Sequence, residues 1–135
     1  MAWQTLADMP SKAGEVASAY CRGELIVVGA GAKPAALNFA TGQWRKVPAP
    51  PKQGSHHAAV CLRGRFYLVG GLQAEGKLQI YDPAANLWVK GTDMPMAVGS
   101  TAAVAFDGRI IACGGIDKNT PKKEDPTTSA CGTCV

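Results

Sequence analysis

Three tryptophans divide this chain into units of nearly equal length. Trp3, Trp44 and Trp88 are separated by 41 and 44 residues. In each unit a proline follows the tryptophan by 7 residues, a turn glycine follows it by 20, and an alanine or glycine follows it by 27. Repeats of about 20–50 residues indicate a stacked or circular architecture, in which each unit packs against its neighbours.

The middle unit shows the expected strands most clearly. Residues 57–62 and 65–70 are apolar runs, and the Arg63-Gly64 pair between them favours a tight hairpin because glycine tolerates a positive φ. A third strand is expected at 78–81 and a fourth at 87–89, and no 3.6-residue apolar period predicts a helix. Four short antiparallel strands in about 45 residues are typical of one β-propeller blade.

The outer units repeat this pattern. The expected strands lie at 16–21, 25–29, 36–39 and 43–47 in the first unit and at 101–106 and 109–114 in the third. In the second half of the third unit, residues 124–131 align with 81–88, which places Cys131 where a tryptophan is expected. We therefore predict a single domain over 1–135, with units at 3–43, 44–87 and 88–131, a tail at 132–135, and an extra N-terminal strand around Trp3.

On its motifs the chain resembles the kelch-repeat proteins. The motifs are Gly70-Gly71, Gly114-Gly115, Tyr81-Asp82-Pro83, Trp3, Trp44, Trp88, Asp8-Met9-Pro10 and Asp93-Met94-Pro95. The first unit departs from the family pattern with Gly29-Ala30 and Leu37-Asn38-Phe39, and the third departs from it with Glu124 and Cys131. The resemblance implies an all-β, kelch-type β-propeller of three four-stranded antiparallel blades, a partial ring in which the signature glycines, aromatic residues and Asp-Pro turn are structural.

Three blades do not close a ring, because propellers contain typically 4–8. An open arc would expose interblade apolar surface and unpaired strand edges. Three explanations are left open: the chain is a fragment or short isoform of a longer protein, two copies pair into a six-bladed ring with C₂ symmetry, or the arc docks into another protein.

The amino-acid composition limits the class of protein and the cellular compartment that we expect. The chain is 47% apolar and 18% charged, as expected for a globular domain, and its net charge of +4 is too scattered to indicate nucleic-acid binding. We expect no membrane segment, because no apolar run approaches ~18 residues, and no signal peptide. Cys21, Cys61 and Cys113 lie in apolar runs, which favours reduced, buried thiols in a cytoplasmic protein over a disulfide framework.

Three short motifs could suggest chemistry. Adjacent strand residues face opposite ways, so His56 and His57 cannot easily share a metal ion, and the resemblance implies a structural histidine here. Cys131 and Cys134 have no second cysteine pair with which to complete a zinc site, and we expect a frayed end there. The Gly29-Ala30-Gly31 stretch lacks the third glycine and the helix of a dinucleotide loop. We expect no catalytic residue, metal or cofactor.

Binding residues are expected in the loops, since strands are constrained by packing. In a propeller the loops between second and third strands and the loops between blades lie on one face. These loops carry Lys12, Glu15, Lys33, Lys52, Gln53, Gln73, Glu75, Lys77, Asp93, Met96, Lys118 and Lys123. Lysines outnumber acids among them, which favours an acidic peptide or partner surface.

The resemblance implies a protein–protein interaction module of the adaptor or scaffold kind that binds a protein partner, and not an enzyme. Two alternatives are left open. One is a kelch-type sugar-processing enzyme, epimerase-like or oxidase-like. The other is a truncated propeller fragment that does not function by itself.

Overall fold

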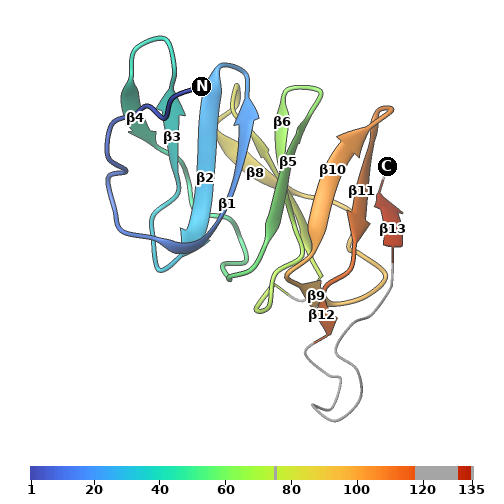
Figure 1. Cartoon of the computed structure of the whole chain (residues 1–135). Coiled ribbons are helices and arrows are strands. Elements are labelled where there is room, and N and C mark those ends of the chain that lie inside the picture. Colours follow the sequence, from blue (N-terminus) through green and yellow to red (C-terminus); the bar gives the residue numbers. More distant parts are fainter. Residues whose placement is uncertain (75, 118–130, 135) are drawn as a thin grey trace.

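In this computed structural model, residues 1–74, 76–117 and 131–134 are described, and they contain strands and turns but no helix. They form three successive antiparallel blades arranged as an arc, and a small two-stranded sheet lies beside the third blade (Figure 1). The first sheet has the order β1-β2-β3-β4 and the second the order β5-β6-β7-β8. The expected all-β arrangement of antiparallel blades is thereby confirmed.

The strands follow the expected runs closely in the first two blades. Their bounds are β1 (Gly14–Cys21), β2 (Glu24–Ala30), β3 (Ala35–Asn38), β4 (Gln43–Lys46), β5 (Ala58–Leu62), β6 (Arg65–Val69), β7 (Leu78–Asp82) and β8 (Leu87–Lys90). The turns between the first and second strands carry their residues at positive φ, including Arg63 at 50° and Gly64 at 74°. These turns lie at one end of the blades, and the longer loops lie at the other end (Figure 1).

The third blade differs from the prediction. Its strands are β10 (Ala102–Phe106), β11 (Arg109–Cys113) and β13 (Cys131–Cys134), in the order β10-β11-β13, while β9 (Val98–Gly99) pairs with β12 (Ile116–Asp117) at the loop end. Cys131 lies opposite Cys113 and Cys134 lies opposite Ile110.

This register makes β13 a third strand. In the middle blade the matching pairs are Val69 with Leu78 and Phe66 with Tyr81, so Cys134 takes the position of Tyr81. The prediction that Cys131 takes the position of a tryptophan on a fourth strand is therefore wrong, as is the expected frayed end. The alignment relied on an Asp-Pro turn signal, but the ladder with β11 decides the register.

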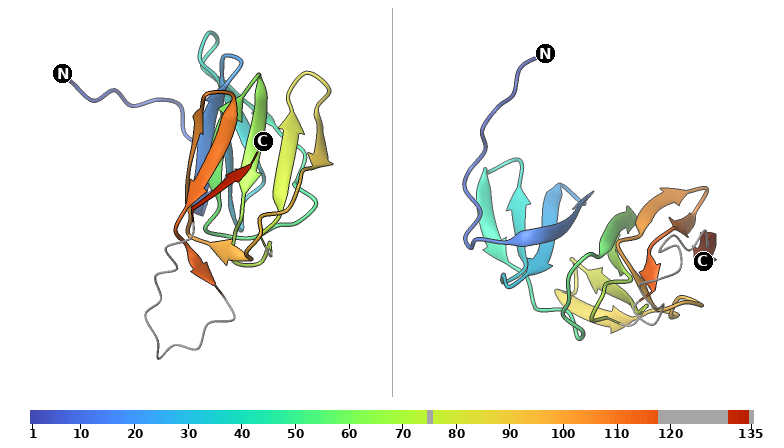
Figure 2. Two further views of the ribbon diagram at one scale, coloured as in Figure 1. Left: turned by 90° about the vertical axis from the view of Figure 1, so that its right-hand side faces the viewer. Right: turned by 60° about the horizontal axis from the view of Figure 1, so that its bottom comes forward.

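The extra strand expected around Trp3 does not form, because residues 1–13 belong to no sheet and Trp3 is fully exposed. A strand needs a neighbouring edge, and β13 lies at the other end of the arc (Figure 2). The segment nevertheless follows the path of an interblade linker. The indole N–H of Trp44 donates to the carbonyl of Ala7 (3.0 Å), just as that of Trp88 donates to the carbonyl of Pro48 (2.7 Å).

The core lies between the blades. Phe66 and Tyr81 are fully buried against the first blade, and the Trp88 ring packs 5.3 Å from the ring of Tyr81. Gly70 and Gly71 allow close approach at the axis: a Cβ at Gly70 would lie 2.6 Å from the carbonyl oxygen of Val98, and one at Gly71 would overlap the His57 ring. Through these contacts the glycine pair and the aromatic residues of the middle blade pack against the neighbouring blades.

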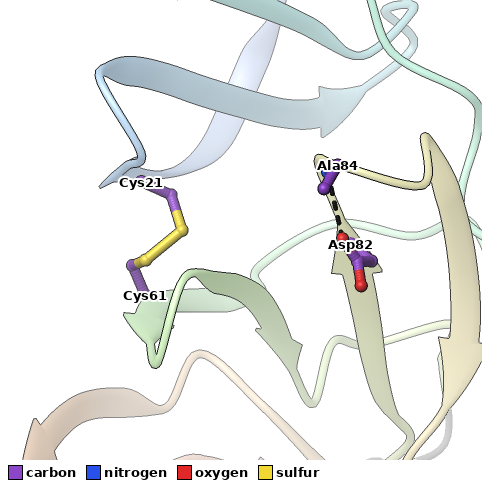
Figure 3. Close-up of a disulfide and its surroundings, with 4 residues drawn as sticks. All are labelled: Cys21, Cys61, Asp82 and Ala84. Atoms are coloured by element: carbon purple, nitrogen blue, oxygen red, sulfur yellow. Dashed lines mark hydrogen bonds between the residues drawn. A yellow bond between two sulfur atoms is a disulfide. The ribbon is translucent and has the colours of Figure 1, made fainter.

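A disulfide joins the first two blades. Cys21 at the end of β1 is bonded to Cys61 on β5, with a Cα–Cα distance of 5.4 Å (Figure 3). Cys113 is disulfide-bonded as well. The expectation of reduced thiols is therefore wrong, because the fold brings together the innermost strands of adjacent blades, whose cysteines lie 40 residues apart in the chain.

Polar contacts complete the blade junction and its turns. Arg45 donates two hydrogen bonds to the Glu24 carboxylate (2.7 and 2.6 Å) and one to the Tyr81 hydroxyl (3.2 Å), which lowers the pKa of Glu24 and links the first blade to the second. Asp82 accepts hydrogen bonds from the backbone of Ala84 and Ala85 and holds the Asp-Pro turn (Figure 3).

Candidate functional site

Loops of the first two blades enclose a pocket at the loop end of the molecule. Its volume is about 360 Å³. The lining residues come from the start of β1, the end of β2, the β4–β5 linker and the β6–β7 loop: Glu15, Gly29, Ala30, Gly31, Gln53, Gly54, Ser55 and Gln73. Interblade linkers and loops within blades thus meet on one face, as the blade topology predicts.

A continuous polar network forms one wall of the pocket. Gln73 Oε1 accepts hydrogen bonds from the backbone N–H of Ser55 (2.9 Å) and from its hydroxyl (3.2 Å). The hydroxyl lies 2.9 Å from Nδ1 of His56, whose Nε2 is 3.4 Å from Oε1 of Glu15. Glu15 and His56 both have positive φ, near 50° and 57°, so the backbone turns at the same repeat position in both blades.

Buried side chains hold the β4–β5 linker in place. Gln79, on β7, accepts a hydrogen bond from the backbone N–H of Lys52 (2.7 Å) and donates one to its carbonyl (2.9 Å). His57 is buried, and its Nδ1 donates to the carbonyl of Gly70 (2.6 Å). Burial lowers the pKa of His57, so its ring is neutral near pH 7. The loop that carries Lys52 and Gln53 is therefore ordered before any partner arrives.

The arrangement offers hydrogen-bond donors and acceptors. Amide groups, a hydroxyl and one carboxylate surround the pocket, and the neighbouring loops add lysines. No three His, Cys, Asp or Glu side chains gather to bind a metal ion in the part of the chain that the structure describes. Such a surface suits recognition of a polar segment.

The comparisons with known proteins agree with the fold. The family described as "Kelch motif" matches residues 55–95. Kelch-like protein 35 of Mus musculus is 31% identical over 125 residues, covering 87% of this chain and 21% of the relative. Kelch repeat and BTB domain-containing protein 13 of Homo sapiens is 28% identical over 125 residues, covering 83% of this chain and 27% of the relative.

This chain is a kelch-repeat protein.

A solved structure supports the arrangement of the blades. The structure titled "Structure of YjhT" has a TM-score of 0.74 and 23% sequence identity, and the match covers 84% of this kelch chain and 37% of that chain. The kelch chain spans only 21% and 27% of the lengths of the two curated relatives cited above. No helix in the described residues is long and apolar enough to cross a membrane.

The predicted binding residues of the kelch loops are exposed, line the pocket, or lie outside the described residues. Lys12, Lys33 and Lys52 are exposed on the segments around the pocket, while Glu15, Gln53 and Gln73 line the pocket itself. Met96 is exposed. Glu75, Lys118 and Lys123 lie outside the described residues. Binding roles for these residues stay predictions.

Lys77 and Asp93 differ from the other loop residues because they pair with each other. Lys77 Nζ donates to Asp93 Oδ2 at 2.8 Å, and Lys90 lies 3.7 Å from the same oxygen. The hydrogen bond from Lys77 lowers the pKa of Asp93. This pair joins the β6–β7 loop to the linker before the third blade, so both residues contribute to the kelch scaffold.

Sequence reasoning missed two parts of the kelch pocket. Ser55 carries no motif, and residues 29–31 were interpreted only as a variant of the glycine pair and as a poor dinucleotide loop. Both line the pocket because it exists only where two blades meet. His56 was interpreted as a poor metal ligand at a position where the family resemblance implies a structural histidine. Its link to Glu15 joins residues 41 positions apart at equivalent points of two repeats, and that equivalence is the signal that could have revealed the link.

Proposed function

We propose that this chain is a protein-binding module that holds a segment of a partner on its loop face, centred on the pocket between the first two blades. The observation that carries the proposal is the pocket of about 360 Å³, whose walls come from loops already fixed by hydrogen bonds. Ordered loops lose little conformational entropy on binding, which favours affinity.

The charges around the pocket favour an acidic partner segment. Lys12, Lys33 and Lys52 are exposed on three separate segments near it, whereas Glu15 is the single carboxylate among the described residues that line it. Lysines on a rim speed association with an anionic partner and orient it. The polar wall of Ser55 and Gln73 offers hydrogen bonds to the backbone of an extended peptide.

Peptide-library selection on the immobilised 135-residue chain tests this proposal. We expect enrichment of acidic peptides, and the selected peptides should lose affinity for a variant carrying Lys12→Glu, Lys33→Glu and Lys52→Glu. The matched control carries Arg22→Glu, Arg63→Glu and Arg109→Glu, which makes the same charge change at the hairpin-turn end. Peptides that bind both variants equally, or a selection without acidic enrichment, would overturn the proposal.

The predicted cytoplasmic location depends on the redox state of Cys21 and Cys61. Disulfides are uncommon in the reducing cytosol and persist in oxidising compartments. Alkylation of free thiols in intact cells, followed by mass spectrometry of the two cysteines, measures this. Alkylated cysteines are expected for a cytoplasmic protein, and protected cysteines would contradict that location.

A further inference from the structure

The third blade ends on an open strand edge, and the N-terminal segment, residues 1–13, belongs to no sheet. β13 is last in the order β10-β11-β13, so among the described residues it has no neighbour on its outer side. In the first two blades a fourth strand, β4 or β8, occupies this place. Trp3 stands at the repeat position of the tryptophans on those fourth strands, yet it is 104% exposed.

The N-terminal segment is already directed toward another blade. Trp44 donates to the carbonyl of Ala7 as Trp88 donates to that of Pro48, so the segment follows the course of a linker that leaves a fourth strand. Within one chain that strand cannot reach β13, because the two lie at opposite ends of the arc (Figure 2).

The two end faces of the arc are equivalent to its buried interfaces. Val104 occupies in β10 the position that Val60 has in β5, but Val104 is 55% exposed and Val60 only 7%. Tyr20, at the position of Cys61, is exposed on the open face of the first blade and contacts Phe39 edge-on at 5.7 Å. Exposed apolar surface of this kind marks an interaction site.

We propose that two copies of this chain close one six-bladed ring by exchanging their N-terminal segments. Residues 2–5 of each copy add to the outer edge of β13 of the partner subunit and complete its third blade. A C₂ arrangement also places the open face of each first blade against the open face of the other copy's third blade. The two equivalent junctions of the ring therefore cover both open strand edges and the apolar end faces of both copies.

The repeat predicts the register of the exchanged strand. Trp88 lies opposite Tyr81, and Cys134 takes the position of Tyr81 in the third blade. Trp3 should therefore lie opposite Cys134 of the partner subunit. Its indole N–H should then reach the linker before the third blade of that subunit, in the manner of the other two tryptophans.

Light scattering coupled to size exclusion tests the association. We expect the 135-residue chain to give a species at twice 14.0 kDa that dissociates on dilution. Trp3→Ala should raise the dissociation constant by roughly 30-fold, as expected when a large aromatic anchor is removed. Val89→Ala, at an exposed position on a fourth strand that is already paired, is the control and should leave it unchanged.

Disulfide trapping tests the register. Under mild oxidation Trp3→Cys should give a covalent dimer in which peptide mapping finds the introduced thiol bonded to Cys134 of the partner subunit. Gln4→Cys, one residue along and facing the other side of the strand, should not. A wild-type chain that stays monomeric, a dimer indifferent to Trp3→Ala, or equal trapping by both cysteine variants would overturn the proposal.

Discussion

The middle blade and the third blade share one repeat pattern but differ in what covers them. Phe66 and Tyr81 of the middle blade are fully buried, because β5 packs against β1 on one side and β10 on the other. In the third blade Val104 and Phe106 are exposed, because nothing in the described chain covers its outer face. A blade is thus stabilised mainly by its neighbours, as in other repeat proteins.

The largest expected effect concerns the tryptophan of the middle blade. Trp88→Ala should destabilise the protein by roughly 3–5 kcal/mol, because it removes a large aromatic side chain packed on Phe66 and Tyr81. Urea denaturation followed by circular dichroism measures the loss. An unchanged unfolding curve would mean that the middle blade is not the packed centre of the molecule.

The disulfide should matter nearly as much. It closes a loop of 40 residues, and the chain-entropy relation gives about 4 kcal/mol for such a crosslink. The double variant Cys21→Ser and Cys61→Ser should therefore unfold at lower urea, and a reductant should lower the stability of the wild type more than that of the variant, which keeps the disulfide of Cys113. Equal sensitivity of both proteins to reductant would assign the effect to other cysteines.

Substitutions at two glycines in equivalent positions allow the packing of the middle and third blades to be compared. Gly70 and Gly114 both have positive φ, near 66° and 70°. Gly70→Ala should cost about 3 kcal/mol, since its Cβ would meet the carbonyl oxygen of Val98 in a strained conformation. Gly114→Ala, with open space among the described residues, should cost only the roughly 1–2 kcal/mol of the left-handed backbone. Equal losses in urea unfolding would contradict the tighter packing of the middle blade.

Two valines at equivalent repeat positions differ in how deeply they are buried. Val60→Ala should cost about 2 kcal/mol, whereas Val104→Ala should cost under about 0.5 kcal/mol in the single chain. Chemical denaturation at several protein concentrations sharpens the comparison: if copies pair through the third blade, the cost of Val104→Ala should grow with concentration. A large cost of Val104→Ala at the lowest concentration would contradict the open face.

A further expected effect on stability depends on pH. The pKa of His57 is lowered from 6.5, chiefly by burial, so the unfolded chain binds the proton first on acidification. The neutral, buried His57 therefore leaves the free energy of unfolding unchanged above pH 6.5. Below that value the free energy of unfolding falls, by at most about 1.4 kcal/mol per pH unit. His57→Thr, which introduces the residue that the third blade has at position 101, should flatten the slope between pH 7 and 5 in urea titrations. An unchanged slope would mean that another titratable group causes the pH dependence of stability.

Much of this protein could be predicted from its sequence. The spacing of the tryptophans and turn glycines determines three blades, and the apolar runs determine the strands of the first two, because both are local consequences of backbone conformation and strand periodicity. The loops that carry Glu15, Gln53 and Gln73 could also be named in advance.

Only the tertiary structure decided the remaining features. The Cys21–Cys61 bond, the Glu15–His56 contact and the pocket wall at Ser55 join residues from different repeats, and local patterns do not report distances across a blade junction. The register of β13 was likewise decided by the free edge of β11, since a degraded repeat leaves several alignments equally good and only hydrogen bonding to a neighbouring strand selects one.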